Sequence, residues 1–160
     1  MNVLTYFDSR EQRAAQRTIA LLAEKFAFAL DILVYSPLSD REVWTRIVRG
    51  EVKELRAEGS FEQAVIKACG AKRYDLVVAA PSDRRGLLRV LLGSRISRLV
   101  GAAPATIWVP RAERLRLRRI VVGVSGGPQS EHDARLAARL AMAYDARLEL
   151  AYVVSQLPLF

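Results

Sequence analysis

The feature that most constrains the fold is a repeated alternation of short apolar runs with amphipathic helical segments. Five runs resemble strands, because they are short, rich in β-branched residues and bounded by polar residues, glycine or proline. These runs are residues 3–7, 30–35, 51–57, 74–79 and 105–109. Segments with a helical period lie between them. This order predicts an α/β domain of the Rossmann-like type, with a doubly wound, parallel five-stranded sheet.

A loop rich in arginine and glycine, residues 80–94, follows the fourth of these runs. It ends in Gly93 and Ser94, where a new helical pattern begins. A strand, a glycine-containing loop and a helix N-terminus are typical of phosphate binding, because free backbone N–H groups and the helix dipole point at the anion. Ligands of such sheets bind at the carboxyl ends of the strands. We therefore expect this loop and Asp8, at the end of the first run, to face one crevice.

A second part of the chain repeats the pattern of its beginning. Residues 119–125, Ser130–Tyr144 and 146–154 resemble the first strand, first helix and second strand, which makes Tyr35 and Tyr152 equivalent. One β-α-β unit buries too little apolar surface to stand alone. We expect it to pack on the first domain, pair with a partner chain or belong to a longer protein. The predicted organisation is a domain at 1–110, an arginine-rich linker at 111–117 and a partial repeat at 118–160.

Composition narrows the class of protein. The 160 residues carry a formal net charge of +8, and no apolar run approaches the roughly 18–20 residues that span a bilayer. No signal peptide is recognisable, so we expect a cytoplasmic protein without a membrane segment. A single cysteine, Cys69, excludes an internal disulfide and a multi-cysteine metal site. The single histidine, His132, has no Ser or Cys nucleophile pattern nearby, so we do not expect the protein to be an enzyme. The sequence does not exclude a slow hydrolysis of ATP.

These features together resemble the universal stress protein family. That family carries, after its fourth strand, a glycine, two residues, a glycine, nine residues and then Gly-Ser or Gly-Thr. Gly93 and Ser94 match the end of this motif, and Gly86 lies in the connecting segment. The resemblance covers residues 2–110 as a whole domain and 118–155 as the first third of a second. It implies an adenine-nucleotide alpha hydrolase-like fold, a role in stress response and a homodimer formed through the fifth strand. We expect the C-terminal repeat to be the alternative surface for this association.

In one branch of the family the domain binds ATP or another adenine nucleotide, with Mg²⁺ as its companion. The resemblance implies that Asp8 contacts the nucleoside and that Tyr35 lies near adenine, with Val34 as the alternative if the register differs. Gly93 and Ser94 match the last phosphate contacts. The same residues also have structural explanations, since Asp8 is a preferred helix N-cap and Gly93-Ser94 can simply begin a helix.

The sequence departs from the family at the two motif glycines, which are replaced by Ala80 and Asp83. A side chain restricts the backbone there, and the carboxylate of Asp83 repels a triphosphate. The neighbouring Arg84 and Arg85 can compensate for that charge. The candidate nucleotide-binding residues are therefore Asp8, Tyr35, Ala80, Asp83, Arg84, Arg85, Gly86, Gly93 and Ser94.

Three functions are compatible with this sequence. The first is a dimeric universal stress protein-type module with a degenerate adenine-nucleotide site. The second is an interaction module of the same fold that binds no nucleotide, as in domains appended to transporters or kinases. The third is an anion or nucleic-acid binder that uses the arginine clusters. We do not expect nucleic acid as a partner, because the chain has no recognition motif and no aromatics interleaved with its arginines.

Overall fold

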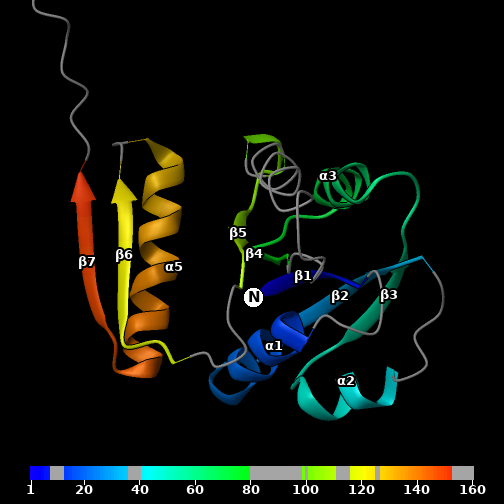
Figure 1. Ribbon diagram of the computed structural model, residues 1–160, viewed down its shortest axis with the longest axis horizontal. Coiled ribbons are helices and arrows are strands. Elements are labelled where there is room, and N and C mark those ends of the chain that lie inside the picture. The colour runs from blue at the N-terminus through cyan, green and yellow to red at the C-terminus, as the bar shows by residue number, and fades with distance from the viewer. Residues whose placement is uncertain are drawn as a thin grey trace, which may run out of the picture. The chain divides into compact units, whose positions relative to one another are not determined.

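The computed structural model of the chain describes residues 1–7, 13–35, 41–79, 99, 101–110, 116–124 and 127–152. The chain divides into two compact units, Met1–Leu115 and Arg116–Phe160 (Figure 1). The bounds expected for the domain, linker and repeat stay a prediction. Within the described ranges, no helix is long and apolar enough to cross a membrane.

Unit 1 contains a parallel five-stranded sheet in the order β3-β2-β1-β4-β5. Figure 1 shows helices α1 and α2 on one face of this sheet and α3 on the other, which confirms the doubly wound α/β fold. The strands are β1 (Asn2–Phe7), β2 (Ala29–Val34), β3 (Val52–Arg56), β4 (Leu76–Val78) and β5 (Thr106–Trp108). The helices are α1 (Arg13–Lys25), α2 (Arg41–Ile47) and α3 (Phe61–Ala71).

The central strands form because their side chains are apolar on both faces. Successive side chains alternate between the two faces of a strand, so Val3 and Leu4 pack on opposite sides of β1, and both are fully buried. On the α3 face, Leu4 joins Leu33, Val65 and Val77 in one cluster. Each such side chain contributes about 1.5–3 kcal/mol by leaving water.

The ends of the elements differ from the sequence-based expectation by one or two residues. The strands expected at 74–79 and 105–109 are limited to Leu76–Val78 and Thr106–Trp108, because pairing with neighbouring strands covers only those residues. Ser60 caps the N-terminus of α3. Its hydroxyl accepts from the N–H of Gln63 at 3.3 Å, and the Gln63 side chain accepts from the N–H of Ser60 at 2.9 Å.

Unit 2 contains β6 (Arg119–Val124), α5 (Pro128–Tyr144) and β7 (Arg147–Tyr152), with the two strands parallel. In its register Tyr152 lies opposite Val124, as Val34 lies opposite Phe7 in unit 1. Tyr152 therefore takes the place of Val34, one residue before the position expected from aligning it with Tyr35. The difference arises because backbone pairing, not side-chain similarity, determines register.

Candidate functional site

The order of the strands places the candidate site at the carboxyl ends of β1 and β4. These strands lie side by side at the point where the strand order reverses, with Val3 beside Leu76 and Thr5 beside Val78. Asp8 follows directly after β1, and the loop at 80–94 follows Ala79. The chain therefore leaves both strands at the same edge of the sheet, where open α/β sheets bind their ligands.

Hydrogen bonds fix the end of β4 on both sides. Thr5 is fully buried, and its hydroxyl donates to the carbonyl oxygen of Val78 at 3.1 Å. On the other side, the N–H of Ala79 donates to the carbonyl oxygen of Trp108 at 2.9 Å. The loop at 80–94 thus begins from a backbone that is held by both neighbouring strands.

Tyr35 follows β2 at the same end of the sheet and is the candidate residue that the structure describes. Its hydroxyl donates to the carbonyl oxygen of Gly59 at 2.6 Å, which ties β2 to the turn before α3. Its ring meets Tyr6 edge-on, with centroids 5.8 Å apart, and Tyr6 in turn contacts Phe61 at 4.5 Å. The ring is fixed in place by these contacts, yet 42% of Tyr35 stays exposed.

The other candidate residues lie outside the described part of the chain, so their roles stay predictions. They are Asp8, Ala80, Asp83, Arg84, Arg85, Gly86, Gly93 and Ser94. Among the residues that are described, no group of three His, Cys, Asp or Glu side chains could hold a metal ion.

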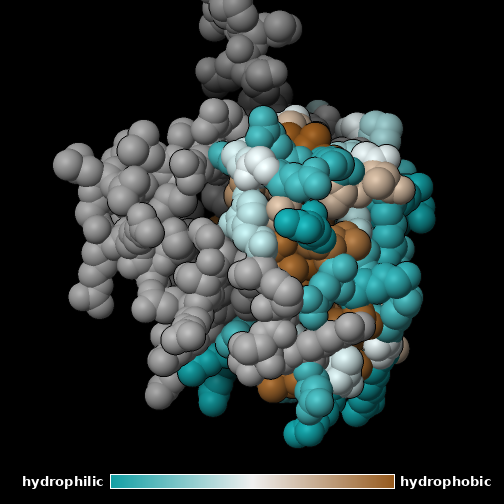
Figure 2. Space-filling view, turned by 90° about the vertical axis from the view of Figure 1, so that its right-hand side faces the viewer, coloured by the Kyte–Doolittle hydropathy of each residue, from teal (hydrophilic) through white to brown (hydrophobic). Residues whose placement is uncertain are grey.

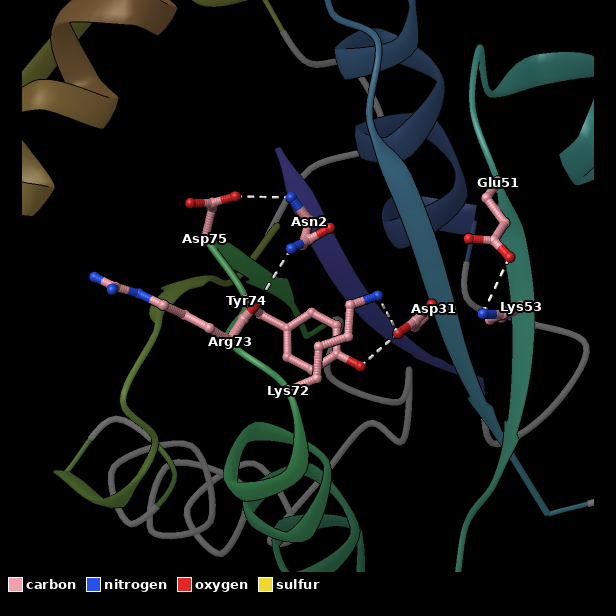
Figure 3. Close-up of polar contacts among 8 residues, drawn as sticks. All are labelled: Asn2, Asp31, Glu51, Lys53, Lys72, Arg73, Tyr74 and Asp75. Carbon is pink, nitrogen blue, oxygen red and sulfur yellow. Dashed lines mark hydrogen bonds and ion pairs between the residues drawn. The ribbon is translucent and has the colours of Figure 1, made fainter.

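A buried polar cluster toward the other end of the sheet was not anticipated from the sequence (Figure 3). Asp31 in β2 is only 3% exposed. One of its carboxylate oxygens accepts from the Lys72 ammonium at 2.8 Å and from the Tyr74 hydroxyl at 2.5 Å. Burial, together with the hydrogen bond to Asp31, raises the pKa of Tyr74. The signal in the sequence was an aspartate inside an apolar strand, since a buried carboxylate requires partners.

The segment between α3 and β4, which carries Lys72 and Tyr74, also holds the start of β1. The backbone N–H of Asn2 donates to the Asp75 carboxylate at 2.7 Å, and the Asn2 side chain donates to the carbonyl oxygen of Arg73 at 3.2 Å. Figure 3 shows these contacts beside the Asp31 cluster. Both sets of contacts join the segment between α3 and β4 to the first half of β1 and β2. We therefore assign this cluster to stability, not to ligand binding.

Unit 2 has a cavity of about 460 Å³ at the carboxyl ends of its strands. The cavity lies at the N-terminus of α5, where Gly127 supplies no side-chain cap. Glu131 at its edge is paired with Arg135. The lining residues are Val124, Gly127, Pro128, Ser130, Glu131, Ala134 and Tyr152.

No protein-family model matches this chain, and no curated protein matches its sequence. Among solved structures, the chain is similar to a universal stress protein crystallised in complex with cAMP. The two share 14% sequence identity, the match covers 69% of this chain and 96% of the other, and the TM-score is 0.48. At this sequence identity and TM-score, the similarity concerns only the arrangement of the backbone, and no residue role is transferred from that protein to this chain.

Proposed function

We propose that this chain is a universal stress protein-type regulatory module that binds an adenine nucleotide at the carboxyl ends of β1 and β4. The observation that supports this is the position of the strand reversal between β1 and β4. Because of it, Asp8 and the arginine- and glycine-containing loop at 80–94 leave the sheet at one edge. We also propose that this module acts in the cytoplasm, as part of a stress response.

The proposed roles follow from the chemistry of each residue. The carboxylate of Asp8 accepts hydrogen bonds from nucleoside hydroxyls. Arg84 and Arg85 neutralise phosphate charge, and the backbone at Gly93 and Ser94 donates N–H groups to phosphate oxygens. The exposed ring of Tyr35 lies beside these strand ends and offers a surface for the base.

Binding, and not catalysis, is the proposed activity. Mg²⁺ would accompany the nucleotide as a companion of its phosphates. Nucleotide hydrolysis requires a positioned base and carboxylates for the metal. The sequence supplies Asp8 directly after β1, and Asp83 is the one acid in the loop at 80–94.

Thermal unfolding with and without millimolar ATP and Mg²⁺ tests the proposal. A ligand that binds only the folded chain raises the unfolding free energy by about 2.7 kcal/mol at a hundredfold excess over Kd. We expect a clear rise in the melting temperature, and cAMP and AMP extend the comparison to other adenine nucleotides. No shift with any of these would contradict the proposal.

Two substitutions locate the binding site. Asp8→Ala should abolish the nucleotide-induced shift, whereas Glu51→Ala removes the same charge before the amino end of β3 and should retain it. The double change Ala80→Gly with Asp83→Gly restores the motif glycines and should tighten binding. Equal shifts in Asp8→Ala and Glu51→Ala would place the nucleotide elsewhere.

The second candidate is an interaction module of the same fold that binds no nucleotide. The replacement of both motif glycines, by Ala80 and Asp83, favours it. In that case the melting temperature is indifferent to nucleotide, and the double glycine variant gains a shift that the natural chain lacks. Both candidates include self-association, proposed through β5 or through the C-terminal unit.

A further inference from the structure

We propose that two copies of this chain associate through the free edge of β6, with the two β6 strands antiparallel. Among the described residues, β6 pairs with β7 alone. The inference rests on the self-association included in the proposed function and assigns it to one strand of unit 2, and it does not depend on nucleotide binding.

The backbone of β6 has one edge that is used and one that is not. The N–H of Arg147 donates to the carbonyl oxygen of Arg118 at 2.9 Å, so the peptide groups of Arg118 face β7. Peptide groups alternate in direction along a strand. The N–H and C=O groups of Arg119, Val121 and Gly123 therefore point to the opposite edge, where the described part of the chain provides no strand.

The side chains of β6 leave that edge unprotected. Natural proteins protect edge strands with charges, with proline or by making them short. β6 has no charge from Ile120 to Val124. The other edges differ: β7 carries Arg147 and Glu149, β5 has only 3 residues, and β3 carries Lys53, Glu54 and Arg56. Figure 2 shows the side of unit 1 with β3, where hydrophilic residues predominate.

The charged side chains of the β6–β7 sheet, by contrast, pair with one another. Glu149 accepts from Arg119 at 2.5 Å and from the Arg147 guanidinium at 2.9 Å. In unit 1 the residue in the same register position is Asp31, which obtains its partner Lys72 from the segment after α3. Unit 2 needs no such segment for Glu149. Within residues 116–124 and 127–152, the edge of β6 beside Val121, which is 57% exposed, has no strand next to it.

A second copy of β6 fits this edge because the strand is self-complementary. In antiparallel pairing centred on Val121, that residue lies opposite Val121 of the second copy, and Arg119 lies opposite Gly123. Each of these pairs exchanges two backbone hydrogen bonds, since all three residues present their peptide groups to the edge. No arginine faces an arginine directly, so the arrangement avoids like-charge repulsion across the strands.

Light scattering of the full chain across a concentration series tests the inference. We expect the natural chain to reach twice the mass of one chain. Val121→Lys places two ammonium groups opposite one another and should weaken association at least tenfold. Leu150→Lys is the matched control, because Leu150 is similarly exposed, at 61%, but lies on β7. It should leave the mass unchanged.

Two further variants test the geometry of the pairing. Val121→Pro removes an N–H that does not bond to β7, so the chain should fold and become a monomer. Val121→Cys should form a disulfide between copies, because Cα atoms in such a pair lie about 5.5 Å apart. Leu150→Cys should not, and Cys69 is buried in both variants. A natural chain that stays monomeric, or a dimer that survives Val121→Lys and Val121→Pro, would overturn the proposal.

Discussion

At the scale of single residues, Asp31 shows how a polar side chain is accommodated in an apolar strand. Removing a carboxylate from water is costly unless charged or hydrogen-bonding partners replace the solvent. Lys72 and Tyr74 provide both, and the Lys72 ammonium also lies 5.2 Å from the centre of the Tyr74 ring. The cluster joins β2 to the segment that leads into β4.

Removing the cation should therefore destabilise the fold. Lys72→Met leaves the carboxylate of Asp31 buried without its counter-charge, and we expect a loss of about 2 kcal/mol in unfolding free energy, measured in urea. The Lys72 side chain is 37% exposed, which places this loss below that of a fully buried pair. Lys67→Met breaks an exposed pair with Glu58 and should have little effect. Equal losses in the two variants would show that burial of Asp31 is not the cause.

The raised pKa of Tyr74 predicts a loss of stability at alkaline pH. Burial and the Asp31 carboxylate hold the hydroxyl protonated in the folded chain. The unfolded chain releases this proton near pH 10, so the folded state binds more protons above that pH and the unfolding free energy falls as pH rises. The Tyr74→Phe variant should have an unfolding free energy about 1 kcal/mol lower at neutral pH, and it has no hydroxyl to titrate at this position. The difference in unfolding free energy between the natural chain and the Tyr74→Phe variant should therefore become smaller above about pH 10. A difference that stays constant with pH would contradict the prediction.

At the scale of elements, the pattern of apolar runs predicted every strand of the five-stranded sheet, because buried parallel strands are continuous in hydrophobicity. Their ends were less predictable, since tertiary pairing limits β4 and β5 to 3 residues each. The candidate site was only partly predictable. Tyr35 lies at the expected sheet edge, but its bond to Gly59 joins segments distant in the sequence. The partners of Asp31 were missed for the same reason.

Two glycines provide a matched test of packing around these elements. A Cβ at Gly50 would lie 2.1 Å from the carbonyl oxygen of Phe28, where β2 and β3 begin side by side. Gly50→Ala should therefore cost about 1–3 kcal/mol. At Gly70, in α3, a Cβ meets nothing within 4 Å, so Gly70→Ala should add about 0.5–1 kcal/mol through helix propensity. Denaturant unfolding measures both, and changes of the same sign would contradict this account.

At the scale of the whole molecule, the net charge of +8 raises the question of a polyanionic partner. Several arginines are already paired in the described part of the chain, such as Arg119 and Arg147 with Glu149. Pairing of this kind reduces the charge available to a phosphate backbone.

We therefore expect no retention of the chain by random duplex DNA at about 150 mM salt, measured by fluorescence anisotropy. Weak binding at low salt that disappears steeply as salt is added would reflect net charge alone. Binding that persists at physiological salt would support the arginine-driven alternative and argue against the nucleotide module.

The position of β1 in the sheet has a consequence for how unit 1 is made. β1 leaves the ribosome before the other strands of unit 1, yet one of its two neighbours, β4, is synthesised about 70 residues later. The bond from Thr5 to Val78 spans a sequence separation of 73. Closing so long a loop costs chain entropy before the favourable contacts between β1 and β4 can form. We therefore expect β1 to pair first with β2 and to gain β4 as its second neighbour only after residues 76–78 have been synthesised.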